Sequence, residues 1–262
     1  MIAPAKINLA LVVGPLRADG KHEVTTVYQA LELADEIDLE PADETTVTGF
    51  DDTIVQKALA LLGGAWRVQI AKRIPVAAGL GGGSSDAAAA LRLANQFRDA
   101  PLSESELHAV AAQVGADVPY FLCIGPQLGT GDGSVLEPID LPVGYAVLLL
   151  LPTGAVKRST ADVYAAFDAR GGETGYLERA AAVRTAVQSV LHPRDLAALP
   201  PNDLGSSPLA VRLRAEGAFR ADVSGAGPTV YGLFDTVDDA ERAQVAVDGL
   251  GETWITKPAW YG

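Results

Sequence analysis

Apolar and polar positions along the chain first predict strands and then a helix. Residues 5–13 are almost wholly apolar and are followed by Gly14 and Pro15, which predicts a strand and a turn. Apolar residues alternate with polar ones over much of 27–40, which favours further strands. Residues 52–62 carry apolar side chains at helical spacing. We therefore expect an opening sheet with a helix after it.

The same patterns continue to the end of the chain. A short strand is predicted at 68–70, and an alanine-rich helix ends near residue 97. Ser103 and Glu106 have the spacing of a capping box, which begins a helix that Gly115 ends. The remaining predictions are a buried strand within 141–156, helices at 159–170 and 176–191, strands at 219–223 and 229–234, and a helix from about 237. The organisation changes after Leu151, so we predict two domains, 1–150 and 151–262.

Composition narrows the class of protein. Hydrophobic residues make up 48% of the 262 positions and charged residues 20%, which excludes a disordered chain. The 33 acidic residues outnumber the 20 basic ones, for a formal net charge of −13. A chain this acidic is not expected to bind nucleic acid or an anionic membrane surface. Its longest uncharged stretch, 141–156, is shorter than the roughly 20 residues of a membrane span.

Cysteine usage is typical of a protein from a reducing compartment, and the histidines show no pattern of metal ligands. Cys123 is the single cysteine, so no disulfide can form within the chain. None of the three histidines has metal-ligand spacing with another. We expect a cytoplasmic protein that acts on a small molecule, as a monomer or a homodimer, with no metal-ligating residues.

A glycine-rich segment is the strongest local sign of chemistry. It runs from Pro75 to Asp86 as PVAAGLGGGSSD and leads into the alanine-rich helix. Glycines let several backbone N–H groups converge on one anion, and a helix N-terminus adds unpaired donors. The segment is not a Walker A loop, a dinucleotide fingerprint or a nucleophile elbow, because the residues that each requires are missing. It predicts a phosphate site built from backbone, with a flexible loop before a capped helix as the alternative.

Two further features become informative only together with this loop. SGAGP, from Ser224 to Pro228, is by itself a β-turn, but paired with the first loop it could close over a nucleotide. Lys6 lies in an apolar strand and Asp117 precedes an apolar run, so each needs a partner of opposite charge if it is buried. Such a pair could activate a hydroxyl group, with the carboxylate as base. On spacing alone, a structural ion pair or two unrelated surface residues are preferred.

In combination, three segments resemble those of the GHMP kinase superfamily. They are PAKINLAL from Pro4, the glycine-rich loop from Pro75, and SGAGPTVY from Ser224. The likeness covers nearly the whole chain in the same order. Four more stretches are most similar to the branch that acts on a cytidylylated methylerythritol: DGKH from Asp19, TVYQ from Thr26, GADVP from Gly115 and NDL from Asn202.

The resemblance implies an α+β fold, with an N-terminal domain like domain 2 of ribosomal protein S5 and a ferredoxin-like C-terminal domain. It implies ATP, with Mg²⁺ held mainly by phosphates and water, and transfer to the 2-hydroxyl of the cytidylylated alcohol in the non-mevalonate isoprenoid pathway. It implies that Asp117 is the base and Lys6 its catalytic partner, and that Asn8, His22 and Tyr164 contact the substrate. The implied ATP contacts are Lys72, Pro75, Ala78, Gly79, Leu80, Gly81, Gly82, Gly83, Ser84 and Ser85.

Several positions depart from the family pattern. Lys21 stands where a tyrosine usually stacks on cytosine, and we expect it to lay its stem along the base and to direct its ammonium toward a substrate phosphate. Residues 131–134 read GDGS where the family usually has Gly-x-Gly-Glu, so Ser134 replaces an acidic residue. Thr53 with Ile54 replaces the usual Asn-Leu. The alternatives are therefore a related kinase for another alcohol, such as homoserine or mevalonate, or a non-catalytic nucleotide sensor on the same fold.

Overall fold

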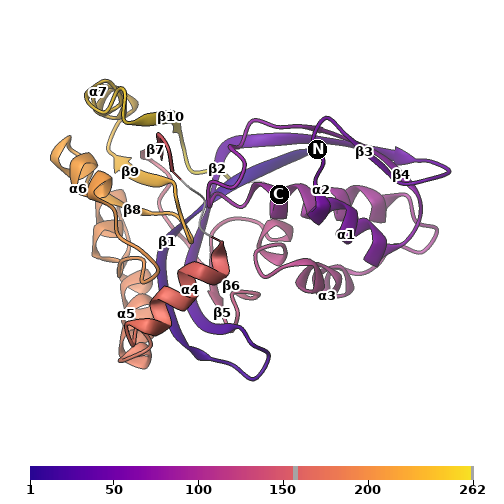
Figure 1. Ribbon diagram of the computed structural model, residues 1–262, viewed down its shortest axis with the longest axis horizontal. Helices are drawn as coiled ribbons and strands as arrows, with labels where there is room; N and C mark the ends of the chain where they lie inside the picture. Colours follow the sequence, from indigo (N-terminus) through magenta and orange to yellow (C-terminus); the bar gives the residue numbers. More distant parts are fainter. Residues whose placement is uncertain (156–158, 261–262) are drawn as a thin grey trace.

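The structure is a computed structural model that describes residues 1–155 and 159–260, and its core is formed by two β-sheets (Figure 1). The first sheet has the order β3-β4-β2-β5-β6, and β1 pairs with β2 in antiparallel register. Its strands are β1 (Ile2–Leu16), β2 (His22–Pro41), β3 (Thr46–Thr48), β4 (Trp66–Ala71), β5 (Gln127–Thr130) and β6 (Val135–Pro138).

The long β1–β2 hairpin is the frame that places the site. Burial on both faces explains the nearly continuous apolar run of β1, where Ile7, Leu9 and Val12 are fully buried. The expected turn at Gly14 and Pro15 is wrong, because β1 continues to Leu16 and the chain reverses over residues 17–21. The strands expected over 27–40 form one continuous strand, β2, which pairs with β1 on both sides of an irregularity at 31–33 and with β4 from Glu36 onward.

Three helices cover the first sheet and lie together on one side of the hairpin in Figure 1. They are α1 (Thr53–Leu62), α2 (Gly82–Gln96) and α3 (Glu104–Val114). Leu59, Leu91 and Leu107 pack in one cluster with apolar residues of β2 and β4. Asp52 caps α1 and the predicted capping box of Ser103 begins α3, which confirms both helices.

The second sheet is antiparallel with the order β10-β7-β9-β8. Its strands are β7 (Ala146–Pro152), β8 (Arg220–Val223), β9 (Val230–Phe234) and β10 (Gly251–Thr256), and α6 (Pro208–Ala215) and α7 (Val237–Ala246) pack against it. The strand predicted within 141–156 is β7, while Val156 lies outside the described residues. A domain boundary at residue 150 would fall inside this strand.

The remaining helices are α4 (Thr160–Ala169), α5 (Tyr176–Ser189), and the short 3₁₀ helices η1 (Pro119–Leu122) and η2 (Pro193–Ala198). Both α4 and α5 confirm their predictions to within two residues. The α+β fold is confirmed as well. Sequence patterns missed α6, β10 and the short strands β3, β5 and β6. No helix within the described residues is long and apolar enough to cross a membrane.

Candidate active site

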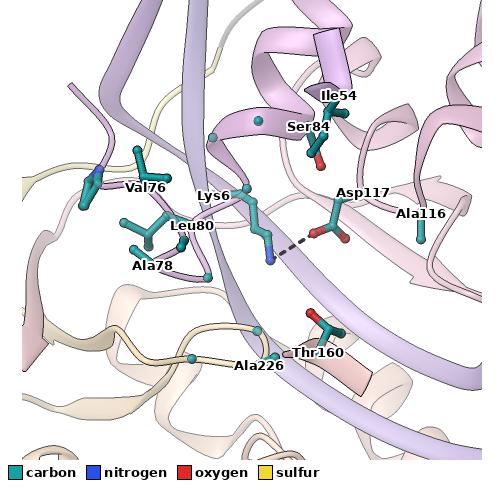
Figure 2. Close-up of a pocket in the computed structure, with 18 of the residues that line it drawn as sticks. Lys6, Ile54, Val76, Ala78, Leu80, Ser84, Ala116, Asp117, Thr160 and Ala226 are labelled. Carbon is teal, nitrogen blue, oxygen red and sulfur yellow. Dashed lines mark ion pairs between the residues drawn. The ribbon is translucent and has the colours of Figure 1, made fainter. Parts of the chain in front are cut away.

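A cavity of about 610 Å³ lies between β1, the start of α2 and the turn before β9 (Figure 2). Apart from two, all the residues predicted to form the site line it: Lys6, Asn8, Lys72, Pro75, Ala78, Gly79, Leu80, Gly81, Gly82, Gly83, Ser84, Asp117 and Tyr164. The exceptions are Ser85 and His22, which are buried and do not line the cavity. The fold therefore brings the three sequence segments together in one place.

The two glycine loops are in direct contact. Gly79 has a φ of +81°, and a Cβ atom there would lie 2.6 Å from the carbonyl oxygen of Ser224 and 2.7 Å from that of Gly227. The Ser224 hydroxyl donates a hydrogen bond of 3.0 Å to the Gly79 carbonyl. The backbone N–H of Thr229 donates to the Ala78 carbonyl at 3.2 Å. The segment from Ser224 is therefore not an isolated β-turn but one wall of the cavity.

The N-terminus of α2 faces this cavity without a side-chain cap among the described residues. Gly81 occupies the cap position in the left-handed region, with φ +74°. Gly82 and Gly83 form the first turn, so the helix begins earlier than its alanine run. Unpaired N–H groups and the positive end of the helix dipole thus converge where a phosphate could bind.

Lys6 and Asp117 meet at the centre of the cavity, as the dashed line in Figure 2 marks. Lys6 Nζ lies 3.4 Å from Asp117 Oδ2 and donates a hydrogen bond of 2.6 Å to Asn8 Oδ1. The lysine side chain is 4% exposed, whereas that of the aspartate is 35% exposed. A buried ammonium therefore stands behind a carboxylate that remains open to a ligand.

Tyr28 completes this arrangement, although sequence reasoning gave it no role. Its hydroxyl donates a hydrogen bond of 3.0 Å to Asp117 Oδ1. Burial and the neighbouring Asp117 carboxylate raise the pKa of Tyr28 well above its usual value, so the phenol stays protonated and remains a donor. The sequence offered Tyr28 only as part of the TVYQ stretch, and its nearness to the site follows from its pairing with Asn8 across the β1–β2 ladder.

Lys72 lies at the base of the glycine loop between two buried carboxylates. Its Nζ atom is 2.6 Å from Asp35 Oδ2 and 2.7 Å from Asp86 Oδ2. Burial raises the pKa of Asp86 to about 7, although Lys72 acts in the opposite direction. A Cβ atom on Gly82 would lie 3.2 Å from the Lys72 ammonium. Lys72 therefore supports the loop from below, and sequence patterns did not reveal its two partners.

One end of the cavity carries an aromatic wall. The ring of Tyr164, on α4, stacks on the ring of His22 with centroids 4.8 Å apart. His22 Nε2 is hydrogen-bonded to Asp168 Oδ1 at 2.8 Å, which fixes the orientation of the imidazole. Lys21, whose ammonium we expect to point toward a substrate phosphate, forms an ion pair with Asp132 in this structure. His22 itself does not line the cavity, but it contacts the ring of Tyr164, which does.

Family models describe two parts of the chain. The model of the GHMP kinase N-terminal domain matches residues 46–125, and that of the GHMP kinase C-terminal domain matches residues 211–253. Both glycine loops and Asp117 lie within these matched residues. The fold and the cavity thus define a small-molecule kinase of the GHMP class, the class to which the sequence segments were found similar.

Curated relatives identify the branch of the GHMP kinases to which the chain belongs. The chain is 36% identical to the 4-diphosphocytidyl-2-C-methyl-D-erythritol kinase of Leifsonia xyli subsp. xyli, over 94% of this chain and 90% of the relative. It is 38% identical to the enzyme of that name from Novosphingobium aromaticivorans, over 94% and 87%. The chain therefore belongs to the 4-diphosphocytidyl-2-C-methyl-D-erythritol kinase family.

Solved structures agree with this assignment. A crystal structure of 4-(cytidine 5'-diphospho)-2C-methyl-D-erythritol kinase superposes with a TM-score of 0.75 at 30% identity, covering 99% of both chains. A mevalonate kinase superposes with a TM-score of 0.73 over 100% of this chain and 99% of its own, but at 14% identity. The second likeness shows the fold alone.

Proposed function

We propose that this chain transfers the γ-phosphoryl group of ATP to the 2-hydroxyl of 4-diphosphocytidyl-2-C-methyl-D-erythritol. The observation that carries the proposal is the Lys6–Asp117 pair, open to a cavity that has a glycine loop on one side and Tyr164 on another. The alcohol is the one in the names of the relatives. ATP is the phosphoryl donor of GHMP kinases.

The geometry supports an in-line transfer. The glycine loop and the first turn of α2 bind the phosphates through backbone N–H groups. Asp117 accepts the proton of the substrate's 2-hydroxyl. As it does so, the hydroxyl oxygen bonds to the γ-phosphorus, and the bond between the γ-phosphorus and the oxygen that bridges it to the β-phosphate breaks, which releases ADP. Lys6, 3.4 Å from Asp117, stabilises the negative charge at the reacting centre. Positioning and charge supply most of the rate in such reactions.

We propose that Mg²⁺ enters this site with ATP and is held mainly by phosphate oxygens and water. The described residues bring together no group of three or more His, Cys, Asp or Glu side chains that could hold a metal ion. Phosphate oxygens and water are ligands that Mg²⁺ accepts readily. The ion would neutralise phosphate charge, while Asp117 remains free for the proton. A cytoplasmic location, and a monomeric or homodimeric state, stay predictions from the sequence.

Tyr164 is the proposed support for the cytosine ring. Its side chain lines the cavity, and its stack on His22 holds the ring in a fixed orientation. Stacking a base on an aromatic ring contributes roughly 1–3 kcal/mol in single-stranded nucleic-acid complexes. Asn8 lines the same cavity and accepts a hydrogen bond from Lys6, and it is the proposed contact for the alcohol end of the substrate.

The test is a coupled ADP-release assay with three acceptors: the cytidylylated methylerythritol, homoserine and mevalonate. We expect turnover with the first and background ADP release with the others. Asp117→Asn serves as the matched control, because it keeps the shape of the side chain and removes the base. A preference for homoserine or mevalonate would overturn the substrate assignment. ATP binding without turnover of any acceptor would instead favour a nucleotide sensor.

A further inference from the structure

We infer that Asn202 is a positioning residue that holds the second glycine loop, residues 224–228, over the catalytic lysine. Asn202 belongs to the NDL stretch from the sequence, and the mechanism described above does not use it. It does not line the cavity. Its influence on transfer would therefore pass through the backbone of the loop.

The Asn202 amide satisfies the loop from behind. Its side chain is buried, and the residue is 6% exposed. Nδ2 donates hydrogen bonds of 2.9 Å to the Val223 carbonyl and 2.7 Å to the Gly225 carbonyl. Oδ1 accepts a hydrogen bond of 2.9 Å from the backbone N–H of Leu204. The amide group of Asn202 thus donates to the two carbonyls on either side of Ser224. Loss of such a donor leaves a buried carbonyl without a partner, which lowers the stability of the fold.

These two carbonyls determine where the loop meets the reacting groups. Gly225 has a φ of +56°, and a Cβ atom there would lie 3.3 Å from Lys6 Nζ and 3.5 Å from Asn8 Oδ1. Figure 2 shows the next residue, Ala226, on the loop that faces Lys6 across the cavity. The approach of Gly225 to the lysine is close enough that even a small movement of the loop alters the space around the Lys6 ammonium.

Asn202 is itself fixed to the strand that carries Lys6. Its segment forms a parallel bridge with Leu11 of β1, and the backbone N–H of Asp203 donates to the Leu11 carbonyl at 2.8 Å. On the other side, the Asn202 backbone N–H donates to Asp222 Oδ2, on β8, at 2.9 Å. The asparagine therefore contacts β1, β8 and the second glycine loop at once. These contacts hold the loop at a constant distance from Lys6, which lies on β1.

Two substitutions test the inference. Asn202→Ala removes both donors, and Asn202→Asp keeps the shape but directs carboxylate oxygens at the two carbonyls. Because misplacement of about 1 Å can lower a rate roughly 100-fold, we expect kcat to fall about 10- to 100-fold in both variants. The KM for ATP should change much less, since the glycine loop at 79–83 and α2 remain intact.

Asn95→Ala is the matched control. Asn95, near the end of α2, also bonds a loop through both ends of its amide: Nδ2 donates to the Leu102 carbonyl at 3.0 Å, and Oδ1 accepts from the Leu102 N–H at 2.8 Å. Its replacement should lower thermal stability while leaving kcat unchanged. If Asn202→Ala and Asn202→Asp both keep the wild-type kcat, the inference is overturned and Asn202 is a structural residue only.

Amide hydrogen exchange provides a second measurement that does not depend on turnover. Peptides that cover 224–231 should exchange faster in Asn202→Asp than in the wild type, whereas peptides from β10 should not. The same loop should exchange normally in Asn95→Ala. Unchanged exchange at 224–231 would overturn the inference. The kinetic arm rests on the proposed function, but exchange does not, so a wild type that fails to phosphorylate the proposed alcohol would overturn only that function.

Discussion

Gly79→Ala is the substitution that tests the contact between the two glycine loops most directly. The added methyl group would lie 2.6 and 2.7 Å from two backbone oxygens, those of Ser224 and Gly227. Backbone oxygens cannot rotate aside as a flexible side chain can. The loops must therefore separate, and the hydrogen bond from the Ser224 hydroxyl to the Gly79 carbonyl must stretch or break.

The magnitude follows from two contributions. A residue with a Cβ at φ +81° is destabilised by roughly 1–2 kcal/mol, and the stiffer unfolded chain returns about 0.4–1 kcal/mol of this. Overpacking against the opposite loop adds about 1–3 kcal/mol. We expect the free energy of unfolding to fall by about 2–4 kcal/mol, and kcat/KM for ATP to fall about 100-fold as the phosphate cradle opens.

Gly249→Ala is the control for this experiment. Gly249 has nearly the same φ, +78°, but among the described residues nothing lies within 4 Å of an added Cβ atom. Urea denaturation should show a loss of about 1 kcal/mol or less for this variant, with full activity. If Gly79→Ala is no less stable than Gly249→Ala and keeps its kcat/KM for ATP, the loops do not depend on each other and the reasoning fails.

Three further predictions concern single side chains. Asp117→Asn should lower kcat by about 10²- to 10⁴-fold while calorimetry shows ATP binding intact; near-normal kcat would make the carboxylate structural. Tyr164→Ala should weaken substrate binding by roughly 1–3 kcal/mol and Tyr164→Phe should not, and equal affinities for both variants and the wild type would remove cytosine from this wall. Because burial raises the pKa of Asp86 from 3.8 to about 7, the folded chain holds a proton that the unfolded chain has released. Stability should therefore fall as pH rises through that interval, with a smaller slope in Asp86→Asn; identical slopes in urea denaturation would contradict this assignment.

Elements with a strong local signal could be predicted from sequence. The capping residues Asp52 and Ser103 begin α1 and α3 where the pattern indicated, because a cap is a contact between neighbours in the chain. The turn expected at Gly14 was wrong for the opposite reason. Pairing with β2 on either side of that glycine, at Val13 and Leu16, keeps the strand going past it, and such pairing depends on residues outside the local window.

The candidate site divides in the same way. The phosphate site at the glycine loop could be predicted from local sequence. Backbone N–H groups can bind a phosphate wherever glycines precede the start of a helix. The partners of Lys72 could not be found, because Asp35 lies 37 positions before it on β2 and Asp86 lies 14 positions after it in α2. Nor could spacing decide whether Lys6 and Asp117 meet, a point that the 3.4 Å separation resolves. Long-range pairing, rather than residue type, was the missing information.

Two departures from the family pattern turn out to be parts of one arrangement. Lys21 replaces a stacking tyrosine, and the stretch at 131–134 lacks its usual acidic position, yet Lys21 forms an ion pair with Asp132 of that stretch. Asp132 also accepts hydrogen bonds from the backbone N–H and the hydroxyl of Ser134, at 3.2 and 2.6 Å. In this structure the lysine ammonium is therefore paired with a protein carboxylate. Lys21 offers no aromatic ring, so the proposed support for cytosine is the ring of Tyr164, which stacks on His22.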